Sequence, residues 1–229
     1  RAQALILAGK VYAGDRRVEK SGDLLPADAN LQIKGKDHPW VSRGGMKLAR
    51  ALEEFSIDVA GFTVIDIGAS TGGFTDVALS NGAVKVYAVD VGHGQLAWSL
   101  RNDPRVVTLE RTNARYLSQD QVPELADLIV CDVSFIGLEL ALSQPLRLTK
   151  PNAWLVALIK PQFEVGKENV GKGGVVRDPR LHEEVCVRAT AWISALPGWD
   201  VLGIVESPIK GPAGNVEFLI VARRTPGLT

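Results

Sequence analysis

The sequence predicts a doubly wound α/β domain over most of its length, preceded by a small β-containing unit. Short apolar runs of strand length alternate along the chain with segments whose apolar residues recur at helical spacing. This alternation is typical of a parallel sheet with right-handed crossover helices. The strand runs also lack polar alternation, which indicates a sheet that is covered on both faces.

The first part of the chain departs from this pattern. Residues 2–7 are typical of the end of a helix, and Gly9 suits its C-cap. Val11-Tyr12 and Arg17-Val18 flank a predicted hairpin turn, and Leu31-Gln32-Ile33 alternates like a further strand. A unit of this size is too short to hold a core alone. It is either a truncated domain or a unit that packs on the rest.

A polar segment with a proline, residues 35–41, predicts a linker after this unit. We expect Trp40 to anchor the linker against one of the two domains.

The larger domain is predicted to begin at Ser42. Its predicted strands are 63–67, 85–90, 106–109, 127–132 and 154–159, and its predicted helices are 45–55, 73–81, 96–100, 136–146 and 180–195. Two further strands, 199–206 and 217–223, are expected to form an antiparallel pair.

Composition limits the classes of protein. The 229 residues are 46% hydrophobic and 23% charged, which is ordinary for a globular protein. The longest apolar runs, 125–133 and 154–159, are strand-sized, and none approaches the roughly 20 residues that cross a bilayer. We therefore expect no membrane insertion. Cys131 and Cys186 have no metal-ligand spacing, so we expect no metal and a reducing cytoplasm.

The net charge of zero counts mildly against a nucleic-acid partner. The cations nevertheless cluster along the chain, at 10–20, 34–50 and 160–180, and a local basic face is enough to bind phosphates. Any one cluster, taken alone, is more simply a solvated surface.

A glycine-rich turn, residues 66–74, lies between the first strand of the larger domain and its helix. Glycine lets a backbone turn tightly and approach a ligand, and the following helix N-terminus favours polar ligand groups. Asp90 ends the next strand, where such folds place a carboxylate for ribose hydroxyls. The turn therefore predicts a cofactor site; the alternative is a plain tight turn with incidental acids.

Several segments together carry a more specific signal. They are residues 42–48, 66–74, 90–96, 111–115, 131–136 and 160–164. These segments resemble the haemolysin A (TlyA-like) family, which joins an S4-type RNA-binding domain to an FtsJ-like 2′-O-methyltransferase domain. The resemblance covers nearly the whole chain. It implies a Rossmann-like fold that uses S-adenosylmethionine.

The resemblance also implies a domain arrangement and a substrate. Residues 1–34 resemble the later part of an S4 domain whose opening helix has no counterpart here, so we expect a partial domain followed by the linker and a methyltransferase domain over 42–229. The implied reaction is methylation of a ribose 2′-hydroxyl in ribosomal RNA, of cytidine in 16S or 23S rRNA. The implied partners are ribosomal RNA or ribosomal subunits; the oligomeric state stays open.

Members of the FtsJ-like group carry a Lys-Asp-Lys-Glu tetrad, and the matching residues are Lys47, Asp132, Lys160 and Glu217. Taken alone, Lys47 is more simply a solvated helix lysine, Asp132 a helix N-cap beside Ser134, and Glu217 an edge-strand charge. Lys160 is harder to dismiss, because it follows a strongly apolar strand, and such strands end near a site in this fold.

The chemistry explains these residue types. A ribose hydroxyl is a weak acid, and a neutral lysine held close to it can accept or steer its proton. The reference pKa of lysine is about 10.4, and a second lysine together with burial would lower it. We expect Lys160 to lie nearest the 2′-hydroxyl, with Asp132 and Glu217 orienting the amines and in-line alignment supplying much of the rate.

The predicted cofactor contacts extend beyond the turn. They are Asp66, Gly68, Ala69, Ser70, Thr71, Gly72, Gly73, Phe74, Asp90, Val91, Asn113 and Asp132. The resemblance implies that Asp66 faces the methionine ammonium and Asn113 the adenine, although Asn113 is also a natural loop residue.

Other features leave alternatives open. The Gly- and Lys-rich segment 163–177 is an RNA-facing lid or a disordered connector. His93 is expected to be structural or adjacent to a ligand, and the tryptophans at 98, 154, 192 and 199 are expected in the core. The rival functions are a cytolysin, a noncatalytic RNA-binding module, and a methyltransferase of small molecules or proteins.

Overall fold

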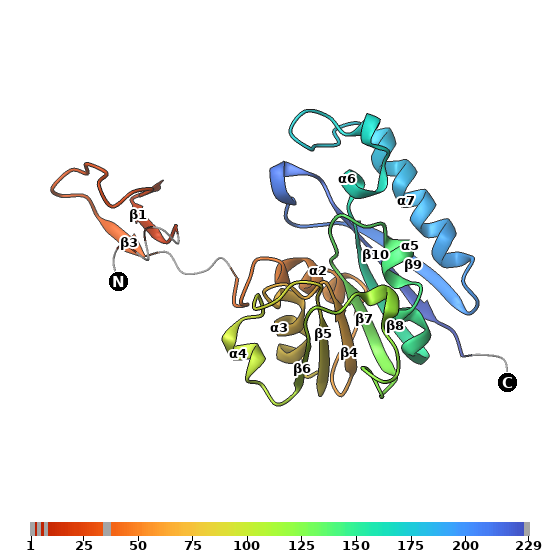
Figure 1. The fold of residues 1–229 in the computed structure, drawn as a ribbon. Helices are drawn as coiled ribbons and strands as arrows, with labels where there is room; N and C mark the ends of the chain where they lie inside the picture. The colour runs from red at the N-terminus through yellow and green to blue at the C-terminus, as the bar shows by residue number, and fades with distance from the viewer. Residues whose placement is uncertain (1–2, 4–5, 7–8, 34–37, 227–229) are drawn as a thin grey trace. The chain divides into compact units, whose positions relative to one another are not determined.

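The computed structural model describes the chain except residues 1–2, 4–5, 7–8, 34–37 and 227–229. The chain divides into two compact units, Arg1–Pro39 and Trp40–Thr229 (Figure 1).

The first unit contains a three-stranded antiparallel sheet in the order β2-β1-β3. Its strands are β1 (Val11–Ala13), β2 (Arg16–Arg17) and β3 (Leu31–Ile33), so the predicted hairpin and third strand are confirmed. Gly9 has φ +67° and donates its N–H to Ile6 O at 2.8 Å, as a helix-ending glycine does. The predicted helix over 2–7 lies largely outside the described residues.

The second unit is built on a seven-stranded sheet in the order β6-β5-β4-β7-β8-β10-β9. Its strands are β4 (Thr63–Ile67), β5 (Lys85–Val89), β6 (Val106–Leu109), β7 (Ala126–Cys131), β8 (Thr149–Ile159), β9 (Trp199–Glu206) and β10 (Phe218–Arg224). The first five are parallel, and β10 runs antiparallel between β8 and β9. The doubly wound fold and the antiparallel final pair are confirmed.

The helices of this unit are short except for the last one. They are α2 (Gly45–Glu54), α3 (Gly73–Ser80), α4 (Trp98–Arg101), α5 (Leu138–Leu142), α6 (Pro161–Glu164) and α7 (Pro179–Ser194). Single 3-10 turns lie at η1 (Ala114–Tyr116), η2 (Pro145–Leu148), η3 (Lys167–Asn169) and η4 (Pro212–Gly214).

The single helix predicted over 136–146 is wrong, because the segment forms α5 and then η2. Gly137 is extended at its start, and Pro145, which has no N–H to continue a helical ladder, begins the 3-10 turn. Helix α6 was not predicted.

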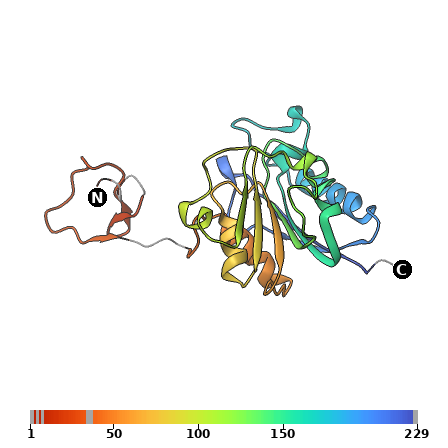
Figure 2. The same ribbon diagram turned by 60° about the horizontal axis from the view of Figure 1, so that its bottom comes forward.

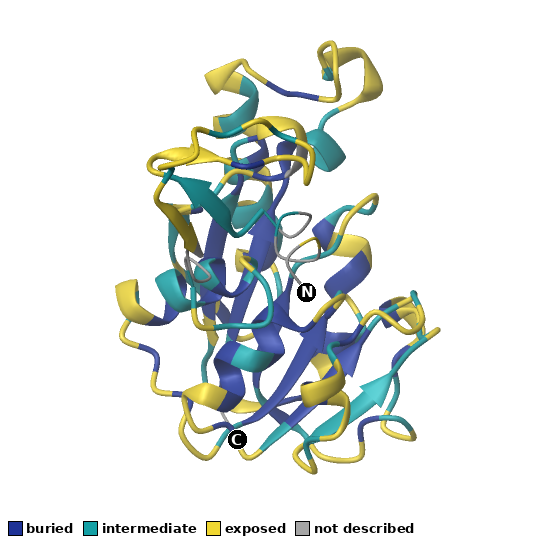
Figure 3. Cartoon of the chain, turned by 90° about the vertical axis from the view of Figure 1, so that its left-hand side faces the viewer, coloured by how far each residue is buried: buried dark blue, intermediate teal, exposed yellow. Residues whose placement is uncertain are grey.

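The sheet separates two hydrophobic clusters. On one face, Ile65 and Ile67 of β4 pack with residues of α5 and α7, whereas Val64 of the same strand packs with α2 and α3 on the other face. Figure 2 shows helices on both sides of the sheet, and Figure 3 shows its strands as the buried interior. Burial on both faces explains why these strands are continuously apolar.

The tryptophans do not all lie in this core. Trp199 is buried, and Trp154 and Trp192 are half-buried against the core. The prediction for Trp98 is wrong, because its side chain is 79% exposed on α4.

Trp40 and Val41 belong to the second unit rather than to the predicted linker. A side chain at Gly45 would meet the Trp40 ring at 2.9 Å, so the indole lies directly against the start of α2. The Val41 N–H donates to Asp76 Oδ2 at 2.7 Å. Trp40 thus anchors this segment to the larger unit.

Within the described residues, no helix combines the length and the apolar character that a membrane span requires. In the same part of the chain, no three His, Cys, Asp or Glu side chains are grouped to hold a metal ion.

Candidate active site

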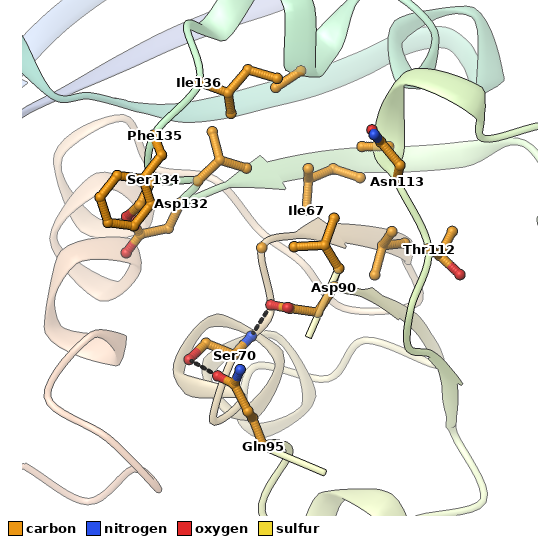
Figure 4. A pocket seen from close by; sticks show the side chains of 16 residues that line it. Ile67, Ser70, Asp90, Gln95, Thr112, Asn113, Asp132, Ser134, Phe135 and Ile136 are labelled. Atoms are coloured by element: carbon orange, nitrogen blue, oxygen red, sulfur yellow. Dashed lines mark hydrogen bonds between the residues drawn. The ribbon is translucent and has the colours of Figure 1, made fainter. Parts of the chain in front are cut away.

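A cavity of about 440 Å³ opens at the carboxyl ends of the parallel strands. From β4 the chain runs outward to β5 and β6 on one side and then returns to β7 on the other side of β4. Ligands of open α/β sheets bind at such a switch point. Loops after β4, β5, β6 and β7 supply the lining. The lining residues are Ile67, Gly68, Ser70, Val89, Asp90, Val91, Gln95, Thr112, Asn113, Ala114, Asp132, Val133, Ser134, Phe135, Ile136 and Ala141 (Figure 4).

The turn after β4 requires glycine at its first position. Gly68 has φ +81°, and a Cβ on it would lie 2.7 Å from Asp132 O. Glycine therefore brings the end of β4 against the backbone that follows β7. Ser70, two residues further on, also has positive φ, at +48°.

Two backbone N–H groups hold the Asp90 carboxylate. The Ser70 N–H donates to Asp90 Oδ2 at 2.8 Å, and the Gly92 N–H donates to Oδ1 at 2.6 Å. The Ser70 hydroxyl donates to Gln95 Oε1 at 3.2 Å, so the loop after β5 is joined to the glycine turn (Figure 4). Asp90 is thereby fixed at the edge of the cavity, as predicted from its place at a strand end.

Half of the predicted cofactor residues line this cavity. They are Gly68, Ser70, Asp90, Val91, Asn113 and Asp132. Ala69, Thr71, Gly72, Gly73 and Phe74 do not line it, because they complete the turn and begin α3. Gln95, Thr112, Ser134, Phe135 and Ile136 line it without having been predicted.

Asp66 lies outside the cavity lining, so its predicted contact with the cofactor stays a prediction. Asp66 is fully buried, does not line the cavity, and accepts a hydrogen bond from Thr75 Oγ1 at 2.6 Å. Burial raises the pKa of Asp66 to about 7, and the Thr75 hydrogen bond only partly opposes that effect. Asp66 thereby ties β4 to α3.

The four predicted tetrad residues come together in one buried ion cluster. Lys47 Nζ lies 2.8 Å from Glu217 Oε2 and 3.1 Å from Asp132 Oδ2. Lys160 Nζ lies 2.6 Å from Asp132 Oδ1, in an ion pair. Both lysines are 7% exposed and Glu217 is not exposed at all. Two cations and two anions balance inside the cluster, as burial of charges requires.

The fold explains why residues so distant in sequence meet. Lys47 lies in the first turn of α2, whereas Asp132 and Lys160 each follow the last residue of a parallel strand. Phe218 of β10 pairs with Ile159 of β8, and this register places Glu217 beside Lys160 at the same edge of the sheet.

The simpler interpretations of Lys47, Asp132 and Glu217, each taken alone, are wrong. Lys47 is enclosed rather than solvated, and Glu217 precedes an interior strand rather than an edge strand. Helix α5 begins at Leu138 with Gly137 at its cap, so neither Asp132 nor Ser134 caps it.

Three further residues support the ion cluster. Lys160 Nζ donates to Ser134 Oγ at 3.0 Å, and Gln162 Nε2 donates to Glu217 Oε1 at 3.3 Å. A Cβ at Gly211 would collide with the Glu217 carboxyl, so this glycine leaves room for it. The segments 131–136 and 160–164 contain the signal for Ser134 and Gln162; nothing in the sequence pointed to Gly211.

The sheet order, the glycine turn and the strand-end carboxylate define a doubly wound α/β protein with a nucleotide-type cofactor site at its switch point. Residues 40–224 match the family described as FtsJ-like methyltransferase, and the chain belongs to this family.

Similar proteins cover nearly the whole chain. It is 49% identical over 223 residues to the 16S/23S rRNA (cytidine-2′-O)-methyltransferase TlyA of Mycobacterium tuberculosis, covering 97% of this chain and 83% of that protein. It is 42% identical over 221 residues to Hemolysin A of Brachyspira hyodysenteriae, covering 96% and 91%. A solved structure from Streptococcus thermophilus, described as a candidate hemolysin, is 43% identical with a TM-score of 0.82, covering 98% of this chain and 82% of that one.

Proposed function

We propose that this protein transfers a methyl group from S-adenosylmethionine to a ribose 2′-hydroxyl of ribosomal RNA, at cytidine in 16S or 23S rRNA. One observation carries the proposal: Asp132 lines the cofactor cavity and also pairs with both lysines of the buried cluster. Asp132 therefore joins the ion cluster, which would activate the ribose hydroxyl, to the cavity that would hold the methyl donor. Family membership and the relative from Mycobacterium tuberculosis support the substrate class.

The cavity suits the proposed cofactor. Its volume of about 440 Å³ is within the range of small-molecule sites. The anchored Asp90 carboxylate would accept hydrogen bonds from ribose hydroxyls, and Val91 and Asn113 would contact the adenine. S-adenosylmethionine supplies an electrophilic methyl group that needs no acid to assist its transfer.

The cluster would orient and activate the acceptor. Asp132 and Ser134 fix the Lys160 amine at the cavity side of the cluster, and the 2′-hydroxyl would bind to that amine. After the ion-paired ammonium has released a proton to solvent, Lys160 Nζ would accept the 2′-hydroxyl proton during methyl transfer. Lys47, held by Asp132 and Glu217, fixes the carboxylate that positions Lys160. The rest of the rate comes from alignment of the reacting atoms.

The first unit would add RNA affinity. We propose that residues 1–34 belong to an S4-type RNA-binding domain, whose β2 carries the exposed Arg16 and Arg17. Because ribosomal RNA is the proposed substrate, we propose that the reaction takes place in the cytoplasm. The ion cluster and the cofactor cavity favour methyl transfer over the membrane lysis in the haemolysin name, and the assembled tetrad favours an enzyme over a noncatalytic module.

Replacing Lys160 tests the proposal. In Lys160→Ala, transfer of labelled methyl from S-adenosylmethionine to purified ribosomal subunits should fall by about 10²-fold or more, because the base and its positioning are lost. Cofactor affinity should persist, because Lys160 does not line the cavity.

Lys150→Ala is the matched control. Lys150 lies on the same strand, β8, near its other end, in an exposed ion pair with Asp127, so its loss should leave turnover unchanged. Full turnover in Lys160→Ala would refute the role of Lys160. Absence of transfer by the wild type to either subunit would refute the proposed function.

A further inference from the structure

The glycine-rich loop, residues 170–177, leads from η3 to α7 and has a defined conformation. Gly171 forms an isolated β-bridge with Val175, in which the Gly171 N–H donates to Val175 O at 3.1 Å. The Gly174 N–H donates back to Gly171 O at 3.0 Å. Between these two residues the loop turns on Gly173 and Gly174, both at positive φ. Its hydrogen bonds argue against a disordered connector.

The side chain of Asn215 clasps this loop. Its Oδ1 accepts the Val176 N–H at 3.0 Å, and its Nδ2 donates to Gly174 O at 2.9 Å. Asn215 is only 2% exposed; its bond to the Val176 N–H is buried, and its bond to Gly174 O is partly buried. On the other side of Val176, its carbonyl lies 2.9 Å from His182 Nε2 of α7.

Asn215 belongs to the same short segment as the tetrad carboxylate. Glu217 follows two residues later, and the segment closes on itself where the Gly211 N–H donates to Asn215 O at 2.9 Å. Gly211 in turn packs against the Glu217 carboxyl. Figure 1 shows the connection between α6 and α7 and that between β9 and β10 at the same end of the sheet. A shift of the loop would therefore act on Glu217 through this segment.

The loop presents positive charge beside the site. Lys172 and Arg177 are exposed within the loop, which carries no acidic residue; exposed Lys167 and Glu168 precede it and exposed Asp178 follows it. Arginine and lysine are the usual phosphate ligands. Lys172 and Arg177, on a loop joined to the Glu217 segment, could therefore bind the phosphates that flank a target ribose. The whole chain has no net charge, so such binding must come from local groups of this kind.

We propose that Asn215 is a positioning residue that fixes the glycine-rich loop beside Glu217, and that Lys172 and Arg177 on this loop bind the phosphate backbone of the RNA substrate. The inference rests on the proposed function for the identity of the substrate. The part of the inference that concerns the clasp, the two hydrogen bonds from the Asn215 side chain to the loop, does not depend on the proposed function.

The clasp is tested with Asn215→Ala. Loss of the two hydrogen bonds to the loop should speed tryptic cleavage after Lys172 by roughly tenfold in the otherwise folded protein. The value of kcat for methyl transfer to ribosomal subunits should fall by about tenfold or more, because Glu217 is no longer held in place. Cofactor affinity should not change. Asn215→Ser keeps a small polar side chain but is too short to bond both the Val176 N–H and Gly174 O, so its effects should be intermediate; it also serves if the alanine variant does not fold.

Asn81→Ala is the matched control, because Asn81 Nδ2 bonds Val77 O at the end of α3, away from the loop. Its tryptic cleavage and kcat should equal those of the wild type. Unchanged cleavage after Lys172 in both Asn215 variants would overturn the clasp. This readout needs no enzymatic activity, so it remains decisive even if the wild type methylates neither subunit, a result that would refute the proposed function instead.

Phosphate binding is tested with Lys172→Gln/Arg177→Gln. Its KM for the subunits should rise, and the slope of log(kcat/KM) against log salt concentration should flatten by about 1.4 to 1.8, the effect of two lost phosphate contacts. Its kcat should stay near that of the wild type. Lys85→Gln/Lys150→Gln removes the same charge at the starts of β5 and β8 and should keep the wild-type slope. Equal slopes for both double variants would refute the assignment of the loop cations.

Discussion

Asp66 and Asp132 are two acidic residues at neighbouring strands, β4 and β7, with opposite surroundings. Asp132 touches two lysines and borders the cavity, whereas Asp66 is enclosed with Thr75 as its hydrogen-bonding neighbour and leaves Oδ1 without a hydrogen-bond partner. Burial raises the pKa of Asp66 to about 7, and the nearby Asp132 charge adds to the rise. Asp66 therefore acts as a largely neutral group below that pH, and Asp132 as the charge that organises the site.

Substitution of Asp66 tests this difference. Unfolded Asp66 ionises near pH 4 and folded Asp66 near pH 7, so within this window the native state binds more protons. Stability should therefore fall as the pH rises from about 4 to 7, by at most roughly 1.4 kcal/mol per pH unit from this residue. In Asp66→Asn that contribution should vanish.

The measurement is the free energy of unfolding in urea at pH 5 and pH 7. The wild type should lose more stability than Asp66→Asn between these two values. Equal losses in the two proteins would show that Asp66 is ionised in the native state throughout.

Individual site residues were predictable to different degrees. The motif resemblance predicted all four residues of the ion cluster, three of which adjoin strand ends, while Lys47 lies at the start of α2. It did not predict Gly211, whose importance comes only from the packing of a turn against Glu217. Its placement of Asp66 at the cofactor stays a prediction; the burial of Asp66 outside the cavity lining was not predictable, because a sequence pattern does not show which way a strand residue faces at a tight turn.

At the scale of elements, helix α3 depends on the glycine that precedes it. Gly72 is the N-cap, has φ +95°, and lies against α4: a Cβ on it would collide with Leu100 and lie 2.9 Å from Leu96 Cδ1. Both leucines are buried. The same glycine thus allows the left-handed backbone and the close approach of two helices beneath the cofactor loop.

Gly72→Ala should be strongly destabilising. The left-handed conformation costs an alanine about 1 to 2 kcal/mol, and the collision with the leucines adds about 1 to 3 kcal/mol. Gly61→Ala is the control, because Gly61 has φ +78° with no atom within 4 Å of its would-be Cβ. Urea unfolding of the two variants separates strain from overpacking: equal losses of stability would mean that the packing against Leu96 and Leu100 carries no cost.

The elements themselves were predictable where local patterns decide them. All seven strands of the large unit were located, because their apolar runs are bounded by turns and polar residues. The place of β10 between β8 and β9 was not, since pairing between distant strands leaves no mark in local spacing. The error over 136–146 has a similar cause: apolar residues recur at helical spacing, yet Pro145 ends that periodicity by its backbone chemistry.

At the scale of the whole molecule, the donor and acceptor machinery belongs to one unit. Every residue that lines the cavity, and all four residues of the ion cluster, lie after Pro39. The unit begins at Trp40, whereas the sequence placed its start at residue 42. The predicted linker, 35–41, ends with Trp40 and Val41, which contact α2 and α3. Nothing in the sequence pattern separates these two residues from the polar segment before them.

The observed start of the larger unit at Trp40 and its predicted start at Ser42 lead to different expectations for the stability of fragments. A fragment of residues 40–229 should fold and bind S-adenosylmethionine as the whole chain does. A fragment of residues 42–229 lacks the Trp40 side chain against Gly45 and the bond from the Val41 N–H to Asp76. It should be less stable by about 2 to 4 kcal/mol, somewhat below the cost of deleting a fully buried aromatic side chain, because Trp40 is half-buried.

Urea unfolding and calorimetric titration with S-adenosylmethionine measure the two properties separately. Because α2 carries Lys47 and packs on α3, which follows the glycine turn, loosening its start should also weaken cofactor binding in the shorter fragment. Trp40→Ala in the whole chain removes the indole without cutting the backbone, and it should reproduce most of the loss of stability. If both fragments unfold at the same urea concentration, then Trp40 and Val41 contribute nothing to the unit, and its fold begins at Ser42 as the sequence pattern indicated.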